Sequence, residues 1–184
     1  MKHKNIQDQL FWITLLFFII GMINISFALV GVLCFTIPFI MYYREKDKVW
    51  CKYYCPRAGM FTKLLTKVSL HLKVPRWLTS NRMKKIVLYY FGINIFFATM
   101  STIMTTLGRI EMIDYVRFMI AFKAPFTLPQ LITLNLPDGL IHFSYRIYSM
   151  MFTSVIVGTI MGILYVPRSW CVICPIQTLT KVKK

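Results

Sequence analysis

Three long stretches of the chain are apolar and free of charged residues. They cover residues 10–43, 86–107 and 147–166 and contain 34, 22 and 20 residues. About 20 helical residues cross the hydrocarbon of a bilayer, so uninterrupted apolar stretches of this length predict membrane-spanning helices. The sequence therefore predicts an all-α fold, a polytopic membrane helical bundle that forms a single membrane domain over residues 1–184.

The first stretch is too long for one ordinary span. Its 34 residues would form a helix roughly 50 Å long, whereas the hydrocarbon core of a bilayer is about 30 Å thick. Gly21 and Asn24 near its middle favour a tight turn between two helices, at about 10–23 and 27–43. This interpretation predicts four transmembrane helices in total, and one long tilted helix is the alternative.

Two connecting segments are predicted to lie at the membrane surfaces. Residues 56–72 place apolar side chains on one helical face, which predicts a cytoplasmic interfacial amphipathic helix. The apolar positions are Met60, Phe61, Leu64, Leu65, Val68 and Leu72. Residues 109–146 are predicted to form an outer cap, interfacial or re-entrant. Within it, Lys123 and two internal prolines argue against a further span over 118–136, although entry into the membrane stays open.

Charge supports a membrane location and indicates an orientation. Only 15% of residues are charged, against about 25% in soluble domains, yet the net charge is +16. Of the 22 Lys and Arg residues, all but the four within 109–146 lie in the N-terminus, in 44–85 or after 166. By the positive-inside rule, those segments face the cytoplasm of an inner (plasma) membrane. Basic residues beside spans contact anionic lipid, so we expect the bilayer, not nucleic acid, as partner.

Four of the five cysteines form two pairs in matching local sequences. The first motif reads Trp-Cys-x3-Cys-Pro over residues 50–56, and the second reads Trp-Cys-x2-Cys-Pro over residues 170–175. Two predicted spans lie between the motifs. An even number of crossings returns the chain to the same side, so we expect the four thiols to meet at the cytoplasmic face. They are Cys51, Cys55, Cys171 and Cys174.

Closely spaced thiols on the reducing side of a membrane favour a metal site over disulfides. A Cys-Pro pair also ends the cysteine run of bacterial ferredoxins, which favours an iron–sulfur cluster. The proline can begin a helix with the cysteine as its cap. Lys52, Arg57 and Arg168 would then place positive charge beside an anionic cluster and raise its potential. A tetrahedral Cys₄ zinc site and thiol redox chemistry remain open alternatives.

Residues 50–59 (Trp-Cys-Lys-Tyr-Tyr-Cys-Pro-Arg-Ala-Gly) resemble the Cys-x3-Cys-Pro motif of membrane-integral 4Fe–4S-binding proteins, the NapH-like and NosR-like family. The second motif is similar to that family's second motif but has two intervening residues instead of three. The resemblance implies an electron-transfer protein in which the four paired cysteines hold a 4Fe–4S cluster. Many relatives also carry soluble ferredoxin motifs, which this sequence lacks, so electrons would pass to a separate partner.

The expected partners are a ferredoxin-like protein or a membrane oxidoreductase, with quinone as a further candidate. The chain would then be a component of an oxidoreductase, and no catalytic residue is assigned. Two smaller centres completed in a homodimer are an alternative to one shared cluster. The alternative function is a zinc-stabilised membrane scaffold or a copper assembly or reduction factor, for which the 12 methionines offer soft ligands.

Two further residues are assigned smaller roles. Cys34 precedes Tyr43 by about 13 Å of helical rise, which places its thiol too deep to join the other four, so we expect it to pack as a small apolar residue. His142 lies in the predicted outer cap, where it could contact a quinone head group. The sequence offers no second histidine in a span for a bis-histidine haem site.

Overall fold

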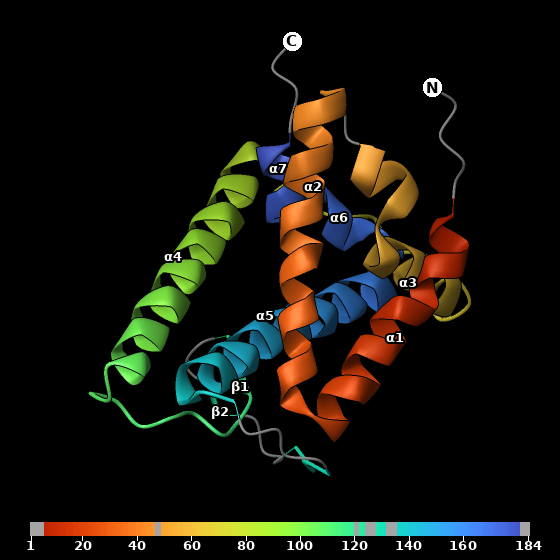
Figure 1. Cartoon of the computed structure of the whole chain (residues 1–184). Coiled ribbons are helices and arrows are strands. Elements are labelled where there is room, and N and C mark those ends of the chain that lie inside the picture. Colours follow the sequence, from red (N-terminus) through yellow and green to blue (C-terminus); the bar gives the residue numbers. More distant parts are fainter. Residues whose placement is uncertain (1–5, 47–48, 120–121, 124–127, 132–135, 181–184) are drawn as a thin grey trace. The chain divides into compact units, whose positions relative to one another are not determined.

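The structure is a computed structural model that describes residues 6–46, 49–119, 122–123, 128–131 and 136–180 (Figure 1). In chain order its elements are α1 (Gln7–Ile23), the 3₁₀ helix η1 (Ile25–Val30), α2 (Gly31–Glu45), the π-helix η2 (Trp50–Tyr54), α3 (Pro56–Leu65), α4 (Asn81–Thr106), β1 (Arg117–Phe118), β2 (Phe122–Lys123), α5 (Asp138–Leu164), α6 (Ser169–Ile173) and α7 (Pro175–Leu179). Within the described residues, the only strands are the short antiparallel pair β1 and β2. The predicted all-α class is confirmed.

Three helical stretches are long and apolar enough to cross a membrane. They are Ile25–Glu45, Asn81–Thr106 and Asp138–Leu164, and a shorter apolar helix, Gln9–Ile23, precedes them. Apolar side chains such as those of Phe96 and Ile93 on the second of these stretches are at least half exposed. An apolar exterior on long helices is expected where lipid is the solvent. The fold is therefore a helical bundle compatible with a membrane protein.

The first apolar stretch breaks where the sequence predicts. Helix α1 ends at Ile23, and Asn24 has an extended backbone and accepts the N–H of Ser26 through its side chain at 2.8 Å. An asparagine at this position caps the next helix by satisfying a free backbone N–H. The last span differs, because α5 begins at Asp138 rather than at 147. The prediction treated the charge of Arg146 as the boundary, whereas the helix continues through it.

The described residues fall into two compact units. Unit 1 comprises those within 1–15, 34–91 and 155–184, and unit 2 comprises those within 16–33 and 92–154. All five cysteines belong to unit 1.

In unit 1, α3 packs on α5 at two glycines. A Cβ at Gly158 would lie 2.4 Å from Cζ of Phe61, and a Cβ at Gly162 would lie 2.4 Å from Cδ1 of Leu65. Phe61 is 1% exposed and Leu65 is 8% exposed. Glycines four residues apart on one helix thus form the surface that receives two side chains four residues apart on the other.

Helix α3 is shorter than predicted, since it ends at Leu65 instead of near 72. The chain that follows satisfies the end of α5: the N–H of Leu70 donates to Ile163 O at 2.7 Å, and Ser69 Oγ donates to Tyr165 O at 2.8 Å. The last carbonyls of a helix have no partner within the helix. These tertiary hydrogen bonds, which helical periodicity does not reveal, explain why the segment leaves the helical path.

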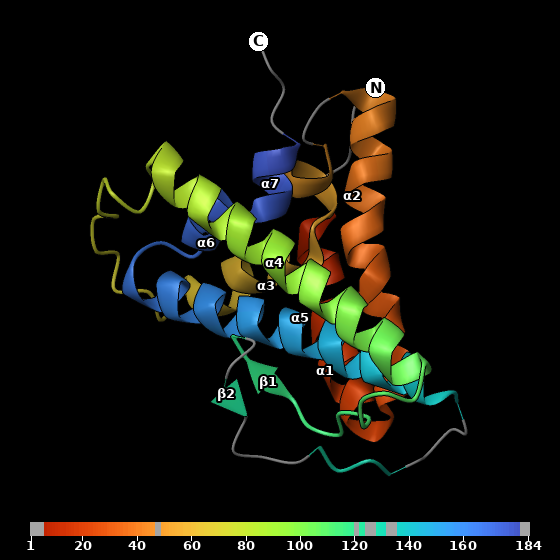
Figure 2. The ribbon, with the colours of Figure 1, turned by 90° about the vertical axis from the view of Figure 1, so that its left-hand side faces the viewer.

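In unit 2, an extended segment runs alongside α5, and Figure 2 shows β1 and β2 beside that helix. Its backbone N–H groups donate to side chains of α5. Ile113 N–H donates to His142 Nδ1 at 3.4 Å, Arg117 N–H to Ser149 Oγ at 3.0 Å, and Met119 N–H to Thr153 Oγ1 at 3.3 Å. Val116 within the segment is fully buried. Polar side chains of a long apolar helix therefore satisfy backbone groups that would otherwise be costly next to lipid.

Candidate metal centre

The first cysteine motif folds as a short π-helix followed by a new α-helix. The N–H of Cys55 donates to Trp50 O at 2.9 Å, which closes η2. Cys55 itself is extended (φ −65°, ψ 112°), and Pro56 is the first residue of α3. Proline suits this position because it has no N–H to leave unpaired and its φ is already helical.

The second motif repeats this arrangement with one residue fewer. Helix α6 ends at Ile173, Cys174 follows with φ −55° and ψ 130°, and Pro175 begins α7. A π-helix spans five residues per hydrogen bond and an α-helix four. The π-turn of the first motif therefore accommodates its extra residue, so in both motifs the second cysteine stands between two helices with proline next to it. The prediction that the proline after each second cysteine begins a helix, with that cysteine at the cap position, is confirmed, and neither Cys55 nor Cys174 makes a side-chain capping bond.

The two motifs contact each other within unit 1, where Figures 1 and 2 show α3, α6 and α7 close together. Arg168, which precedes α6, donates from Nη2 to Cys51 O at 3.3 Å. The same carbonyl accepts Nε2 of Gln7 at 2.9 Å. A Cβ at Gly59 would lie 2.1 Å from Gln7 O, so the close approach of α1 to α3 requires glycine there.

The charge of Arg57 interacts with cysteines from both motifs. Burial lowers its pKa, but the charges of Cys34, Cys174, Cys55 and Cys171 together raise the pKa above its usual range. Three of these four cysteines belong to the predicted ligand set. Arg57 as a whole is half-buried, and a cation in such a place favours thiolates over neutral thiols.

Burial makes two of the thiols hard to ionise. It raises the pKa of Cys55 to about 12, with further increases from Cys34 and Cys171, and Arg57 and the Ala58 amide oppose it only in part. Burial and the neighbouring Cys174 also raise the pKa of Cys171, against the lowering effect of Arg168. These thiols are therefore neutral near pH 7 unless a metal displaces their protons, as metals do when they bind cysteine.

Cys34 lies closer to the motifs than the sequence predicted. Arg57 Nη2 donates to Cys34 Sγ at 3.9 Å, and the Cys34 thiol is near enough to raise the pKa of Cys55. The prediction counted only the helical rise along α2, whereas the first turn of α3 reaches towards Cys34 through the long arginine side chain. Only the residue type of Cys34 could have signalled this, because no motif surrounds it.

Among the described residues, no three His, Cys, Asp or Glu side chains are grouped so that they could hold a single metal ion. His142, in unit 2, is fully buried and both its ring nitrogens are engaged: Nε2 lies 3.0 Å from Ser101 Oγ, and Nδ1 lies 3.2 Å from Thr105 Oγ1. Its ring is therefore satisfied by protein groups. Comparison with family models, with curated proteins and with solved structures finds no match to this chain.

Proposed function

We propose that this chain is a membrane-bound iron–sulfur electron-transfer protein of the NapH-like and NosR-like type. In this proposal one 4Fe–4S cluster is held by the four paired cysteines, Cys51, Cys55, Cys171 and Cys174. The observation that carries the proposal is the hydrogen bond from Arg168 Nη2, just before the second motif, to Cys51 O of the first motif at 3.3 Å. The charge of Arg57 also interacts with Cys55 of the first motif and with Cys171 and Cys174 of the second.

The donor set suits an anionic cluster. Four thiolates and a cubane together carry net negative charge, and Arg57 and Arg168 supply two positive charges beside them. Cys55 also precedes the N-terminus of α3, whose partial positive charge favours an anionic neighbour. Half-buried Trp50 and Trp170 next to the first cysteine of each motif would limit access of water. When bound, such a cluster supplies transfer of single electrons at a potential set by these charges.

The sequence of the motifs favours a cluster over zinc. Each cysteine pair ends in a Cys-Pro step, as the cysteine run of bacterial ferredoxins does. Tetrahedral Cys₄ zinc sites also use closely spaced cysteine pairs, so zinc is the competing metal. If metal analysis found zinc or copper in place of iron and sulfide, the chain would instead be a zinc-stabilised scaffold or a copper-handling protein.

The remaining parts of the proposal concern location and partners. The distribution of Lys and Arg supports a plasma-membrane protein with the cysteine motifs on the cytoplasmic side. Electrons would pass between a quinol or a soluble ferredoxin and a second redox protein, since the sequence carries no ferredoxin-type cysteine run of its own.

The test is metal and acid-labile sulfide analysis of the full chain, purified anaerobically in detergent, together with a visible spectrum. The proposal expects about four irons and four sulfides per chain, falling on Cys55→Ser or Cys171→Ser. Cys34→Ser removes a thiol outside both motifs and should leave the iron content unchanged. Zinc without sulfide, or an equal loss of iron in the Cys34→Ser variant, would contradict the ligand assignment.

A further inference from the structure

Two cations of unit 2 lie over one tyrosine ring, and a third interacts with that tyrosine. Arg117 and Lys123 are directly opposite each other in the β1–β2 pair. The Lys123 ammonium lies 4.4 Å from the centre of the Tyr115 ring, and the Arg117 guanidinium carbon lies 5.1 Å from the same centre. Arg117 Nη2 also donates to the Tyr115 hydroxyl at 2.7 Å. The aromatic ring thus holds both cations in place through cation–π attraction.

A third cation reaches this site from α5. Arg146 lies near enough to Arg117 for their like charges to repel, and near enough to Tyr115 for an electrostatic interaction. Its Nε is buried and has no hydrogen-bond partner. An unpaired buried donor on a charged group is costly, so a native site of this kind normally has an acceptor.

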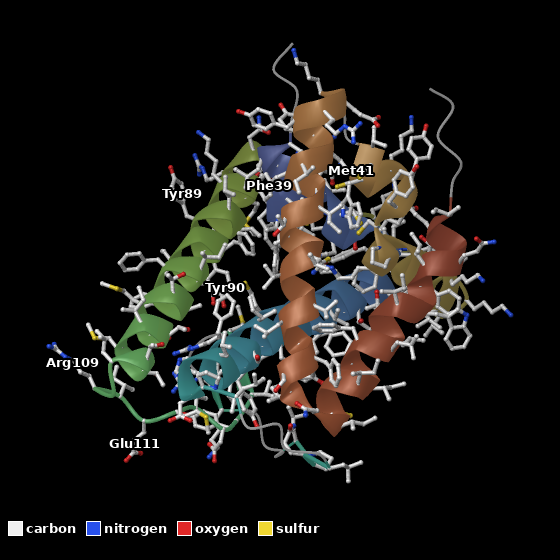
Figure 3. The ribbon with its side chains drawn as sticks, in the orientation of Figure 1. Phe39, Met41, Tyr89, Tyr90, Arg109 and Glu111 are labelled. Carbon is white, nitrogen blue, oxygen red and sulfur yellow. The ribbon has the colours of Figure 1, made fainter. Side chains whose placement is uncertain are left out.

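The described part of the chain supplies no counter-ion for this group. None of Arg117, Lys123 and Arg146 forms an ion pair with a carboxylate of a described residue. Glu111 is exposed, and Figure 3 shows its side chain pointing away from the ribbon, while Asp114 lies near Tyr145. Holding three like charges together without an anion is unfavourable.

We propose that Arg117, Lys123 and Arg146 form a binding site for a phosphate group, with Tyr115 as the platform that orients two of them. Guanidinium groups match phosphate oxygens with paired N–H donors, and the lysine adds a point charge. The phosphate is either the head group of an anionic phospholipid or free inorganic phosphate. The membrane source is favoured by Met119 and Phe122 on the same hairpin, which are 43% and 67% exposed and can contact acyl chains.

The experiment measures lipid binding to the full chain in neutral detergent by native mass spectrometry. The probes are dioleoylphosphatidylglycerol and dioleoylglycerol, which share acyl chains but differ in the phosphate. We expect Arg146→Gln and Lys123→Gln each to weaken phosphatidylglycerol binding about fivefold. The matched control is Arg109→Gln, because Arg109 is exposed, projects outward in Figure 3 and changes the net charge equally.

The possible results distinguish a lipid head group from free phosphate, and two of them would refute the proposed site. If inorganic phosphate competes with the lipid and its own binding depends on the same residues, the ligand is free phosphate. If it does not compete, the ligand is a lipid head group. Equal weakening by Arg109→Gln, or equal binding of dioleoylglycerol, refutes the site. Lys123 is exposed, so its variant remains informative if Arg146→Gln fails to fold, and Arg146→Lys should retain part of the affinity.

Discussion

Gly59→Ala tests whether the contact between α1 and the first cysteine motif is as close as the structure has it. An added Cβ would lie 2.1 Å from Gln7 O and 2.9 Å from Gln7 C. Backbone atoms cannot turn aside as a side chain can, so the start of α1 must move. That movement breaks the hydrogen bonds of Ile6 N–H to Tyr53 O and of Gln7 Nε2 to Cys51 O.

The magnitude follows from these contacts. Overpacking costs about 1–3 kcal/mol, and each lost hydrogen bond costs about 1 kcal/mol. Alanine regains up to about 1 kcal/mol through its higher helix propensity. The free energy of unfolding should therefore fall by about 2–4 kcal/mol. Gly92→Ala is the matched control, because Gly92 is also helical and nothing lies within 4 Å of its added Cβ, so it should leave stability unchanged or raise it by up to about 1 kcal/mol.

The assay is unfolding of both variants in the same detergent, followed by circular dichroism, with the iron content measured in parallel. Opposite signs of the two stability changes support the reasoning, and Gly59→Ala should also lower iron retention because Cys51 loses a fixed neighbour. If Gly59→Ala were as stable as the Gly92→Ala variant, the close approach of α1 to α3 would be refuted.

Three further predictions concern charge, a buried ring and a thiol. Arg57→Gln should lower the midpoint potential of the proposed cluster because a positive charge is removed, whereas exposed Lys63→Gln on the same helix should change it little in an EPR-monitored titration. His142→Ala should reduce the free energy of unfolding by about 2–4 kcal/mol through lost hydrogen bonds and a cavity, measured by chemical denaturation. In metal-free protein, alkylation of Cys55 should still accelerate between pH 9 and pH 11, because its pKa is raised from 9.0 to about 12. A rate that levels off near pH 9 would contradict the burial of that thiol.

The sequence predicts a helix well where a single local cause determines that helix. Uncharged apolar stretches must be helical in a membrane, and Asn24 can cap a helix through its own side chain, so both features are readable locally. The ends of α3 and α5 depend on other segments. Ser69 and Leu70 stop α3 by bonding to the last turn of α5, and the charge of Arg146 is accommodated beside Tyr115 instead of ending a helix.

Some features of the candidate site could likewise be predicted from the local sequence, and others could not. The helical start after each Cys-Pro pair follows from the chemistry of proline, and the meeting of the motifs was predicted by counting spans. The charge of Arg57 beside the paired cysteines was expected from the sequence, but its contact with Cys34 was not predictable, since it depends on how α2 and α3 approach each other. The grouping of Arg117, Lys123 and Arg146 near Tyr115 was not predicted, because it brings together the β1–β2 pair and α5.

The π-turn of the first motif has a consequence for how such motifs diverge. A single-residue insertion into an α-helical turn is absorbed as a π-turn without moving the flanking helices. Cys-x3-Cys-Pro and Cys-x2-Cys-Pro are then length variants of one framework, separated by one codon. Deleting Tyr53 would convert the first motif into the form of the second while Cys55 still stands directly before the proline that begins α3. Searches for ancestral duplication should therefore align the two halves on the Cys-Pro step and permit a one-residue gap before it.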